Sequence, residues 1–257
     1  MKRAHRNMAA ELTGLTAVVT GAGSGIGLAT ATHLADAGVR VIGLDINAGA
    51  MEGIAEWIAC DVGSAESVTA AFRQIAASAS VLDILVNNAG IGAVGTVEDA
   101  TDEDWAHVLN INVTGIARVT REALPLMRHS ESAAIVNTCS IAATVGLRKR
   151  AIYSASKGAV QSLTRAMAAD LVYENIRVNC VNPGTADTPW VARLLDQAQD
   201  PSAERIALEQ RQPNGRLVTA EEVASAICFL AHPDQRSTTG TVLAVDGGMD
   251  GLRVATR

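Results

Sequence analysis

Short runs of apolar residues alternate with longer stretches of helical periodicity along most of the chain. The apolar runs predict strands over residues 15–20, 39–45, 57–60, 82–87, 133–138, 176–182 and 241–246. Helical patterns are predicted over residues 25–37, 64–77, 101–127 and 151–173, with Ser64 and either Thr101 or Asp102 as N-cap residues. Parallel strands buried on both faces are joined by right-handed helical crossovers. The pattern therefore predicts an α/β fold with a doubly wound, seven-stranded parallel sheet and helices on both faces.

One segment interrupts this alternation. Residues 186–214 hold Pro189, Pro201 and Pro213 around a polar helical stretch, a composition that favours a lid over a domain boundary. No other linker is visible, so residues 12–257 are expected to form a single domain. Residues 1–11 precede it as an extension without periodicity, and no function is assigned to them.

Composition narrows the classes of partner. The 257 residues are 48% hydrophobic, which excludes a disordered chain, and only 3% aromatic, with a net charge of −6. An acidic chain poor in aromatic residues is ill suited to nucleic acids and to anionic membranes. No apolar run is long enough to span a bilayer, and the four cysteines and five histidines form no metal-binding motif. We therefore expect a cytoplasmic protein with reduced thiols, no bound metal and a small-molecule partner.

The loop after the first predicted strand is rich in glycine. Residues 20–27 read TGAGSGIG and run directly into a predicted helix. Glycines at 21, 25 and 27 permit a tight turn and the close approach of a pyrophosphate, which the free N–H groups at the start of the helix would bind. A strand–helix turn without a ligand fits the same loop, so this motif alone does not decide.

Asp45 makes the loop more informative. It ends the second predicted strand, 18 residues after Gly27, close to the offset at which a carboxylate binds the adenosine ribose of a dinucleotide. Such a carboxylate would repel the extra phosphate of NADP, and the next residues (Ile46, Asn47 and Ala48) supply no positive charge. The sequence therefore favours NAD. The alternative is that Asp45 is a solvated turn residue.

Tyr153 and Lys157 are candidates for acid–base chemistry. A spacing of four places both on one face of the predicted helix over residues 151–173. The chain has only two tyrosines and three lysines, so a chance pair at this spacing is improbable. A free tyrosine has a pKa of about 10, and a neighbouring ammonium favours its ionised form. The alternative is a surface tyrosine beside a solvated lysine.

Two further polar residues are placed near this pair by the predicted fold. Ser140 follows the strand over residues 133–138, at the edge where doubly wound sheets bind ligands, and its hydroxyl could hold a substrate oxygen. A helix cap or a turn is the alternative. Asn112 lies in a helical pattern and could bind a water that relays protons to Lys157. Taken alone, Asn112 is better explained as a buried side chain bonded to the backbone.

Five motifs together resemble those of the short-chain dehydrogenase/reductase family, of the ordinary-length NAD-dependent type. They cover nearly the whole chain: TGAGSGIG (20–27), NNAG (87–90), Ser140 with YSASK (153–157), VNPGTADT (181–188) and DGG (246–248). The resemblance implies a Rossmann fold and a catalytic group of Asn112, Ser140, Tyr153 and Lys157. Asn112 is preferred to Asn110 because the family pattern has a glycine three residues later, here Gly115.

The resemblance also implies roles for these residues. Tyr153 would be the acid–base, Ser140 would orient the substrate oxygen, and Lys157 would bind the nicotinamide ribose. Contacts with NAD are implied for Gly21, Ser24, Gly25, Ile26, Gly27, Asp45, Asp61, Val62, Asn88, Ala89, Gly90, Tyr153, Lys157, Pro183, Gly184 and Thr188. A homotetramer is implied as well.

Arginines suggest the kind of substrate. Arg150, Arg193 and Arg211 occur close to Tyr153 or in the predicted lid, and arginine binds carboxylates in a bidentate manner. A solvated basic face or salt bridges between subunits are equally good explanations. The stretches ADTPWVAR (186–193) and RQPNGRLVTAEEVA (211–224) resemble a branch with 2-keto-3-deoxy-fuconate dehydrogenases and the cytosolic type of 3-hydroxybutyrate dehydrogenase.

The sequence therefore predicts an NAD-dependent oxidoreductase that interconverts a secondary alcohol and a ketone by hydride transfer. A small hydroxy acid, sugar acid or sugar is the expected substrate. The first alternative is an NADPH-dependent carbonyl or 3-oxoacyl reductase, which would need a basic residue where Ser24 and Asp45 stand. The second, from a different class, is a non-catalytic dinucleotide-binding regulator, which has no need of Ser140, Tyr153 and Lys157 together.

Overall fold

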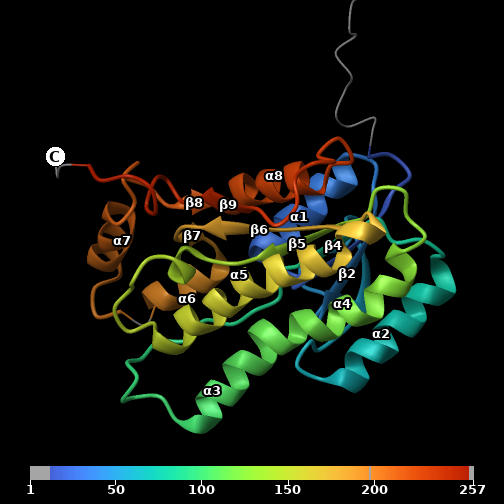
Figure 1. Ribbon diagram of the computed structural model, residues 1–257. Coiled ribbons are helices and arrows are strands. Elements are labelled where there is room, and N and C mark those ends of the chain that lie inside the picture. The colour runs from blue at the N-terminus through green and yellow to red at the C-terminus, as the bar shows by residue number, and fades with distance from the viewer. Residues whose placement is uncertain (1–11, 197, 255–257) are drawn as a thin grey trace, which may run out of the picture.

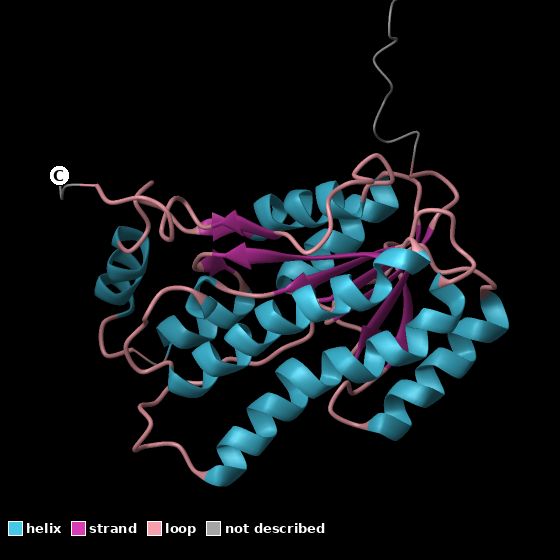
Figure 2. Cartoon of the chain, viewed as in Figure 1, coloured by secondary structure: helices cyan, strands magenta, loops and turns pink. Residues whose placement is uncertain are grey.

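A computed structural model of the chain describes residues 12–196 and 198–254; the N-terminal extension of residues 1–11 lies outside the described residues. The central sheet (Figures 1 and 2) is made of seven strands: β1 Thr16–Thr20, β2 Arg40–Asp45, β3 Glu56–Ala59, β4 Ile84–Asn87, β5 Ala134–Thr138, β6 Arg177–Pro183 and β9 Val242–Val245. All neighbouring strands are parallel, in the order β3-β2-β1-β4-β5-β6-β9. The predicted doubly wound parallel sheet is thereby confirmed.

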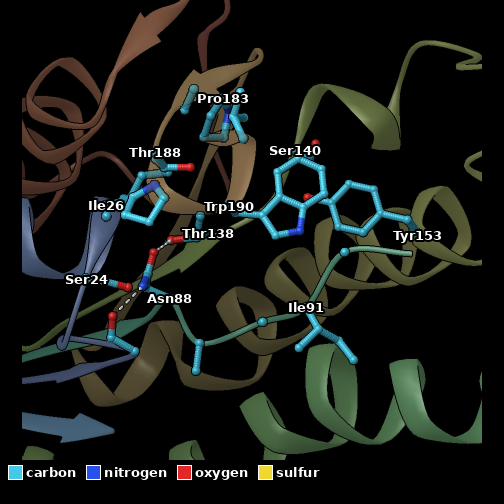
Figure 3. A pocket seen from close by; sticks show the side chains of 18 of the residues that line it. Ser24, Ile26, Asn88, Ile91, Thr138, Ser140, Tyr153, Pro183, Thr188 and Trp190 are labelled. Carbon is cyan, nitrogen blue, oxygen red and sulfur yellow. Dashed lines mark hydrogen bonds between the residues drawn. The ribbon is translucent and has the colours of Figure 1, made fainter. Parts of the chain in front are cut away.

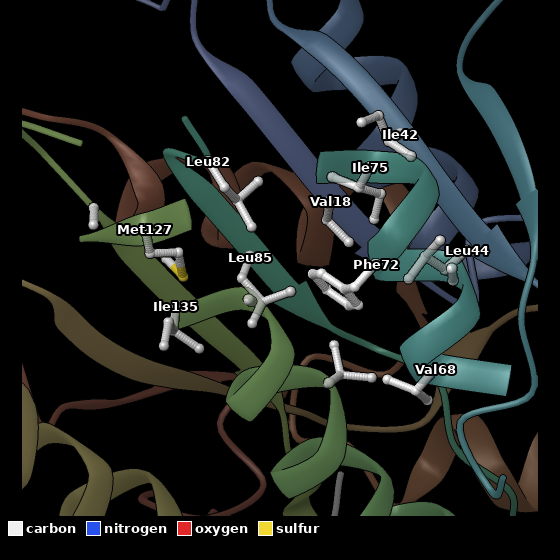
Figure 4. Packing of buried hydrophobic residues seen from close by; sticks show 14 of the residues in the cluster. Val18, Ile42, Leu44, Val68, Phe72, Ile75, Leu82, Leu85, Met127 and Ile135 are labelled. Atoms are coloured by element: carbon white, nitrogen blue, oxygen red, sulfur yellow. The ribbon is translucent and has the colours of Figure 1, made fainter. Parts of the chain in front are cut away.

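Helices cover both faces of the sheet, as predicted. On one face lie α1 Gly25–Asp36 and α8 Ala220–Ala231, which pack against each other. On the other lie α2 Ala65–Ser78, α4 Gly115–Met127 and α5 Ala151–Leu171. Successive β1 residues point to opposite faces. Val18 therefore joins the core beneath α2 and α4, which Figure 4 shows around Phe72, whereas Val19 joins the core beneath α1 and α8.

The predicted helix over residues 101–127 is divided in three. It begins as α3 Asp102–Leu109, with Thr101 as N-cap residue in a capping box with Asp104. A π-turn over Asn110–Thr114 follows and leads directly into α4. Single π-turns within α-helices are frequent at functional sites. The prediction of one continuous helix was therefore wrong at this turn.

The sequence analysis expected helical character within residues 186–214 but did not assign several of the individual elements. The segment over residues 186–214 contains α6 Pro189–Asp196 and α7 Pro201–Gln210, and β7 Ala186–Asp187 pairs with β8 Val218–Thr219. Helix α8 was not predicted, although Thr219 and Glu222 form its capping box, a signal visible in the sequence. The predicted helix over residues 151–173 ends at Leu171 and is followed by a 3₁₀ turn, Val172–Glu174. In the described part of the chain, no helix has the length and apolar character needed to cross a membrane.

Candidate active site

A cavity of about 510 Å³ lies at the carboxyl ends of the central strands. Its walls come from the loop after β1, the ends of β2, β4, β5 and β6, the start of α5, and the segment over residues 186–214 (Figure 3). Doubly wound sheets bind ligands at this edge, where the direction of the strand order changes between β1 and β4. The cavity brings together almost every residue that the sequence analysis singled out.

The glycine-rich loop forms the floor of one end. Gly25 has a φ of +55°, a conformation that favours glycine. Gly27 is buried and does not line the cavity, but a Cβ there would overlap the carbonyl group of Gly21. Ser24 occupies the N-cap position of α1, yet its side chain makes no capping hydrogen bond. Its hydroxyl and the free N–H groups of α1 therefore remain available to a phosphate.

Two carboxylates lie at the same end. Asp45 ends β2 and lines the cavity; its Oδ2 accepts a hydrogen bond of 3.0 Å from the Gly23 N–H. Asp61 also lines the cavity and accepts a bond of 2.7 Å from the Gly63 N–H. Asp45 is therefore both part of the cavity wall and a brace for the glycine-rich loop, rather than only a solvated turn residue.

The segment after β4 is tied to the glycine-rich loop. The Thr20 hydroxyl accepts hydrogen bonds from the backbone N–H groups of Asn88 and Ala89, at 2.9 and 3.0 Å. Asn88 donates from Nδ2 to the Thr20 carbonyl at 3.1 Å. It accepts from the Thr138 hydroxyl at 3.4 Å (Figure 3). Asn88, Ala89 and Gly90 all line the cavity, which these bonds hold in a fixed shape.

Lys157 and Tyr153 lie together where the cavity meets α5. Lys157 is buried, and its Nζ donates to the Thr138 carbonyl at 2.8 Å. The same Nζ lies 5.8 Å from the centroid of the Tyr153 ring. Cys139, which follows β5, also contacts α5, because its thiol donates to the Lys157 carbonyl at 3.1 Å. The structure therefore places an ammonium beside a half-buried phenol, so Tyr153 is not a surface residue next to a solvated lysine.

The sequence left open whether Ser140 caps a turn or faces the ligand site, and the structure shows both. It is the N-cap residue of a 3₁₀ turn, Ile141–Ala143, and its Oγ accepts a hydrogen bond of 3.2 Å from the Ala142 N–H. It also lines the cavity together with Tyr153 (Figure 3). Because the hydroxyl accepts the capping bond, its own hydrogen remains free to point to a ligand oxygen.

Asn112 does not line the cavity. It is buried within the π-turn, donates from Nδ2 to the Ile91 carbonyl at 2.9 Å and to the Ser156 hydroxyl at 3.0 Å, and accepts from the Ile91 N–H at 2.8 Å. This is the backbone-bonded arrangement that the sequence favours when Asn112 is considered without the family resemblance. Asn110 points elsewhere, since it donates to the Gly63 carbonyl at 3.0 Å and accepts from Arg118 at 2.7 Å.

The three candidate substrate arginines all line the cavity at its other end. Arg150 donates to the Ala93 carbonyl at 3.1 Å, and its guanidinium carbon lies 5.4 Å from the centroid of the Trp190 ring. Burial lowers the pKa of Arg150, but arginine stays charged in proteins. Arg193 makes no hydrogen bond or ion pair with the described residues, and Arg211 is 4.0 Å from Glu204. Arg150 is half-buried, whereas Arg193 and Arg211 are exposed, so a solvated basic face still fits these two side chains.

Sequence reasoning missed much of the wall at this end. Trp190 lines the cavity beside Arg150. Apolar side chains from the 3₁₀ turn, the loop before α5, α6 and α7 complete the wall: Ile141, Leu147, Leu194 and Leu208. The only signal in the sequence was a tryptophan next to a proline in the predicted lid, in a chain with three tryptophans.

A parallel sheet that opens at its carboxyl edge into a cavity with a glycine-rich floor and a paired tyrosine and lysine defines a Rossmann-fold oxidoreductase. A family model described as enoyl-(acyl carrier protein) reductase matches residues 21–250. A cis-4-hydroxycyclohexanecarboxylate dehydrogenase from Sinomonas cyclohexanicum is 42% identical over 242 residues, which cover 90% of this chain and 95% of that protein.

Two further comparisons agree. A 3-oxoacyl-(acyl-carrier-protein) reductase from Thermotoga maritima is 34% identical and covers 93% of this chain and 98% of its own length. The ligand-free aldohexose dehydrogenase of Thermoplasma acidophilum has a TM-score of 0.91 at 33% identity, over 96% of this chain and 99% of that structure. The chain thus belongs to the short-chain dehydrogenase/reductase family, oxidoreductases that bind a nicotinamide dinucleotide and act on alcohols and ketones.

Proposed function

We propose that the protein uses NAD to interconvert a secondary alcohol and a ketone, and that its substrate is a small hydroxy acid. The observation that carries the choice of NAD is the carboxylate of Asp45 in the cavity wall at the end of β2. A carboxylate in this place accepts ribose hydroxyls and repels a 2′-phosphate. Ser24 and Ile46, which line the cavity nearby, offer no charge to offset that repulsion.

Three residues divide the chemistry between them in this proposal. Tyr153 takes the proton of the substrate hydroxyl during oxidation and returns it during reduction. Lys157, fixed by its bond to the Thr138 carbonyl, holds an ammonium beside the phenol and binds ribose hydroxyls. Ser140 donates a hydrogen bond to the substrate oxygen and so orients it. Bound nicotinamide supplies the acceptor and donor of hydride.

Asn112 acts indirectly, by positioning other residues. Its amide fixes Ile91, whose chain segment lines the cavity, and Ser156, which lies next to Lys157 in sequence. In this proposal Asn112 also anchors the water through which Lys157 passes protons to solvent. The π-turn replaces the regular i to i−4 bonds with i to i−5 bonds, as from the Gly115 N–H to the Asn110 carbonyl, and single π-turns are frequent at functional sites.

The distribution of charge supports an acidic substrate. Asp45 and Asp61 line one end of the cavity, whereas Arg150, Arg193 and Arg211 line the other. A substrate with a carboxylate would place it among the arginines and its hydroxyl near Ser140 and Tyr153. The residues over 186–214 supply Arg193 and Arg211, and we propose that this segment is a lid over the bound substrate.

The test is the rate of absorbance change at 340 nm with NAD and with NADP, against matched hydroxy acids, sugars and neutral alcohols. We expect turnover with NAD and a higher kcat/KM for hydroxy acids than for neutral alcohols with the same carbon skeleton. Preference for NADP with acyl thioesters would instead support the 3-oxoacyl reductase, an activity in the name of the relative from Thermotoga maritima. Tight binding of NAD without turnover of any substrate would support the regulator.

We also propose a cytoplasmic homotetramer. The cysteines are free, and burial raises the pKa of Cys60 to about 11 and that of Cys228 to about 12, so both stay as unreactive thiols. Exposed apolar side chains such as Phe229 and Leu252 are candidates for contact between subunits. Light scattering on the purified protein tests the assembly, and a monomer would contradict it.

A further inference from the structure

The arginine-lined end of the cavity is unusually poor in neutral polar groups. We call it the substrate end and define it as the cavity-lining residues within 141–150 and 190–211. Apart from Arg150, Arg193 and Arg211, the described residues that line it are apolar or aromatic, with no Ser, Thr, Asn, Gln, Asp or Glu among them. The side chains here donate hydrogen bonds from guanidinium and indole N–H groups, but none of them accepts a hydrogen bond from a ligand hydroxyl group.

Trp190 is held at the substrate end by two contacts on different elements. A Cβ at Gly92 would lie 2.5 Å from Cζ2 and 2.8 Å from Nε1 of the indole, so this edge of the ring rests directly on a residue without a side chain. Arg150 lies over the ring, 5.4 Å from its centroid, and is itself bonded to Ala93. Figure 3 shows the indole on the side of the cavity where Ser140 and Tyr153 lie.

Gly92 is therefore needed for space and not for its backbone. Its φ lies outside the positive range that favours glycine, so an alanine there would keep the backbone conformation. The three atoms nearest to an added Cβ all belong to the Trp190 indole. A methyl group at Gly92 would consequently push the indole out of its place and disturb little else.

We propose that Trp190, seated on Gly92, is a specificity-determining residue that selects substrates with a compact hydrocarbon skeleton over polyhydroxylated ones. The flat face of an indole gains from contact with CH₂ groups of a ring or chain. A sugar hydroxyl moved from water to the same surface loses its hydrogen bonds and regains none. This inference rests on the proposed function and chooses among its substrates: a hydrocarbon hydroxy acid, not a sugar acid.

The test compares two acids, so that the contribution of the arginines cancels. The ratio of kcat/KM for cis-4-hydroxycyclohexanecarboxylate to that for gluconate is measured with NAD. Inhibition constants of two monoanions without a secondary hydroxyl, cyclohexanecarboxylate and the hydroxylated 2,2-bis(hydroxymethyl)propionate, are measured beside it. We expect the wild type to favour the ring acid in both measurements, and Trp190→Ala to lower both ratios at least tenfold through weaker binding of the ring acid.

Gly92→Ala provides an independent approach to the same residue. It should lower the two ratios in the same direction and change the tryptophan fluorescence, and the double variant Gly92→Ala/Trp190→Ala should be no worse than Trp190→Ala alone. Ile206→Ala is the matched control, because Ile206 lies on α7, is exposed and does not line the cavity. It should leave both ratios unchanged. The dissociation constant for NAD checks that each variant is folded.

The outcomes separate this inference from the proposed function. Ratios that change less than twofold in Trp190→Ala, or additive effects of the two substitutions, would overturn the role of Trp190 while the activity on acids stands. A wild type that prefers gluconate would overturn it as well. If the wild type turns over only neutral alcohols, the carboxylate in the proposed function is wrong, and Trp190 is then judged by the same ratio for cyclohexanol and glucose.

Discussion

The Nζ of Lys157 lies 5.8 Å from the centroid of the Tyr153 ring while it donates to the Thr138 carbonyl at 2.8 Å. One bond to the end of β5 thus fixes the position of an ammonium next to a phenol on α5. Tyr153→Phe keeps the ring and removes the hydroxyl, so we expect turnover to fall about 10³-fold, in the range typical for the loss of an acid–base group.

Binding of NAD should hardly change in Tyr153→Phe, as measured by titration calorimetry. Tyr173→Phe is the natural control, since Tyr173 is the only other tyrosine in the chain and its side chain is 95% exposed. A Tyr153→Phe enzyme with a tenth or more of the wild-type rate would show that another group transfers the proton.

Asp45→Ser tests the choice of cofactor. The variant loses the carboxylate that would repel a 2′-phosphate and the acceptor for the Gly23 N–H. We expect kcat/KM for NAD to fall about tenfold or more and NADP to become usable, because one charge-assisted hydrogen bond contributes about 1.5–3 kcal/mol. Initial rates with both dinucleotides provide the measurement. The control is Asp36→Ser at the exposed end of α1, and an unchanged NAD preference in Asp45→Ser would remove Asp45 from this role.

Replacing Arg193 and replacing Arg150 should have different effects on the kinetics with acids and with neutral alcohols. Arg193 has no partner among the described residues, so Arg193→Ala should raise KM for a hydroxy acid about tenfold or more and leave a neutral alcohol unaffected. Arg150 also holds Ala93 and lies over Trp190, so Arg150→Ala should impair both kinds of substrate. Steady-state kinetics with a matched acid and alcohol distinguish the two. Equal effects of Arg193→Ala on both would argue against a carboxylate clamp.

Glu222 gives a prediction for pH. Hydrogen bonds from Arg216, at 2.8 and 2.6 Å, and from the Thr219 N–H lower the pKa of Glu222 to about 2. Because the folded-state pKa is depressed, the stabilisation is complete above the ordinary value of 4.5 and is lost as the pH falls towards 2. Glu222→Gln should therefore reduce the free energy of unfolding by about 1 kcal/mol at pH 7, a value limited by solvent screening.

The difference in the free energy of unfolding between Glu222→Gln and the wild type should shrink as the pH falls from 5 to about 2. Urea denaturation at a series of pH values measures this difference. Glu221→Gln is the matched control, because this neighbouring carboxylate is exposed. A difference that stays constant from pH 7 to pH 3 would mean that Glu222 acts through packing rather than through its charge.

Local patterns in the sequence were sufficient for the frame of the fold. The central strands are apolar because both faces of the sheet are covered there, whereas the edge strand β3 buries only Ile58. Ser64 and Thr101 cap α2 and α3 through their own side chains. These signals act over a few residues, which is why they can be recognised without the structure. Helices α6 and α7 are short, and they pack around Val191 and Leu208, so their positions depend on tertiary contacts.

The site residues likewise divide into those with a local sequence signal and those placed by tertiary contacts. The glycine-rich loop, Asp45, Ser140, Tyr153 and Lys157 lie in motifs with fixed spacing, and the cavity contains residues from all of them. Trp190 was missed because the indole packs against Gly92, which lies in a distant part of the chain. The π-turn was missed because it depends on bonds from Asn112 to Ile91 and Ser156, which no local periodicity records. The catalytic roles themselves stay predictions until the variants are measured.

The π-turn Asn110–Thr114 also limits how the gene for this protein can change in length. Asn110 holds the loop at Gly63, and Asn112 holds Ile91 on the opposite side. The π-turn accommodates one residue more than a regular α-helical turn, so a deletion here would leave the flanking helices aligned but would remove or displace one of the two asparagines. Substitutions can accumulate along this helix, but a single-codon deletion in the turn would release either the loop at Gly63 or the segment at Ile91.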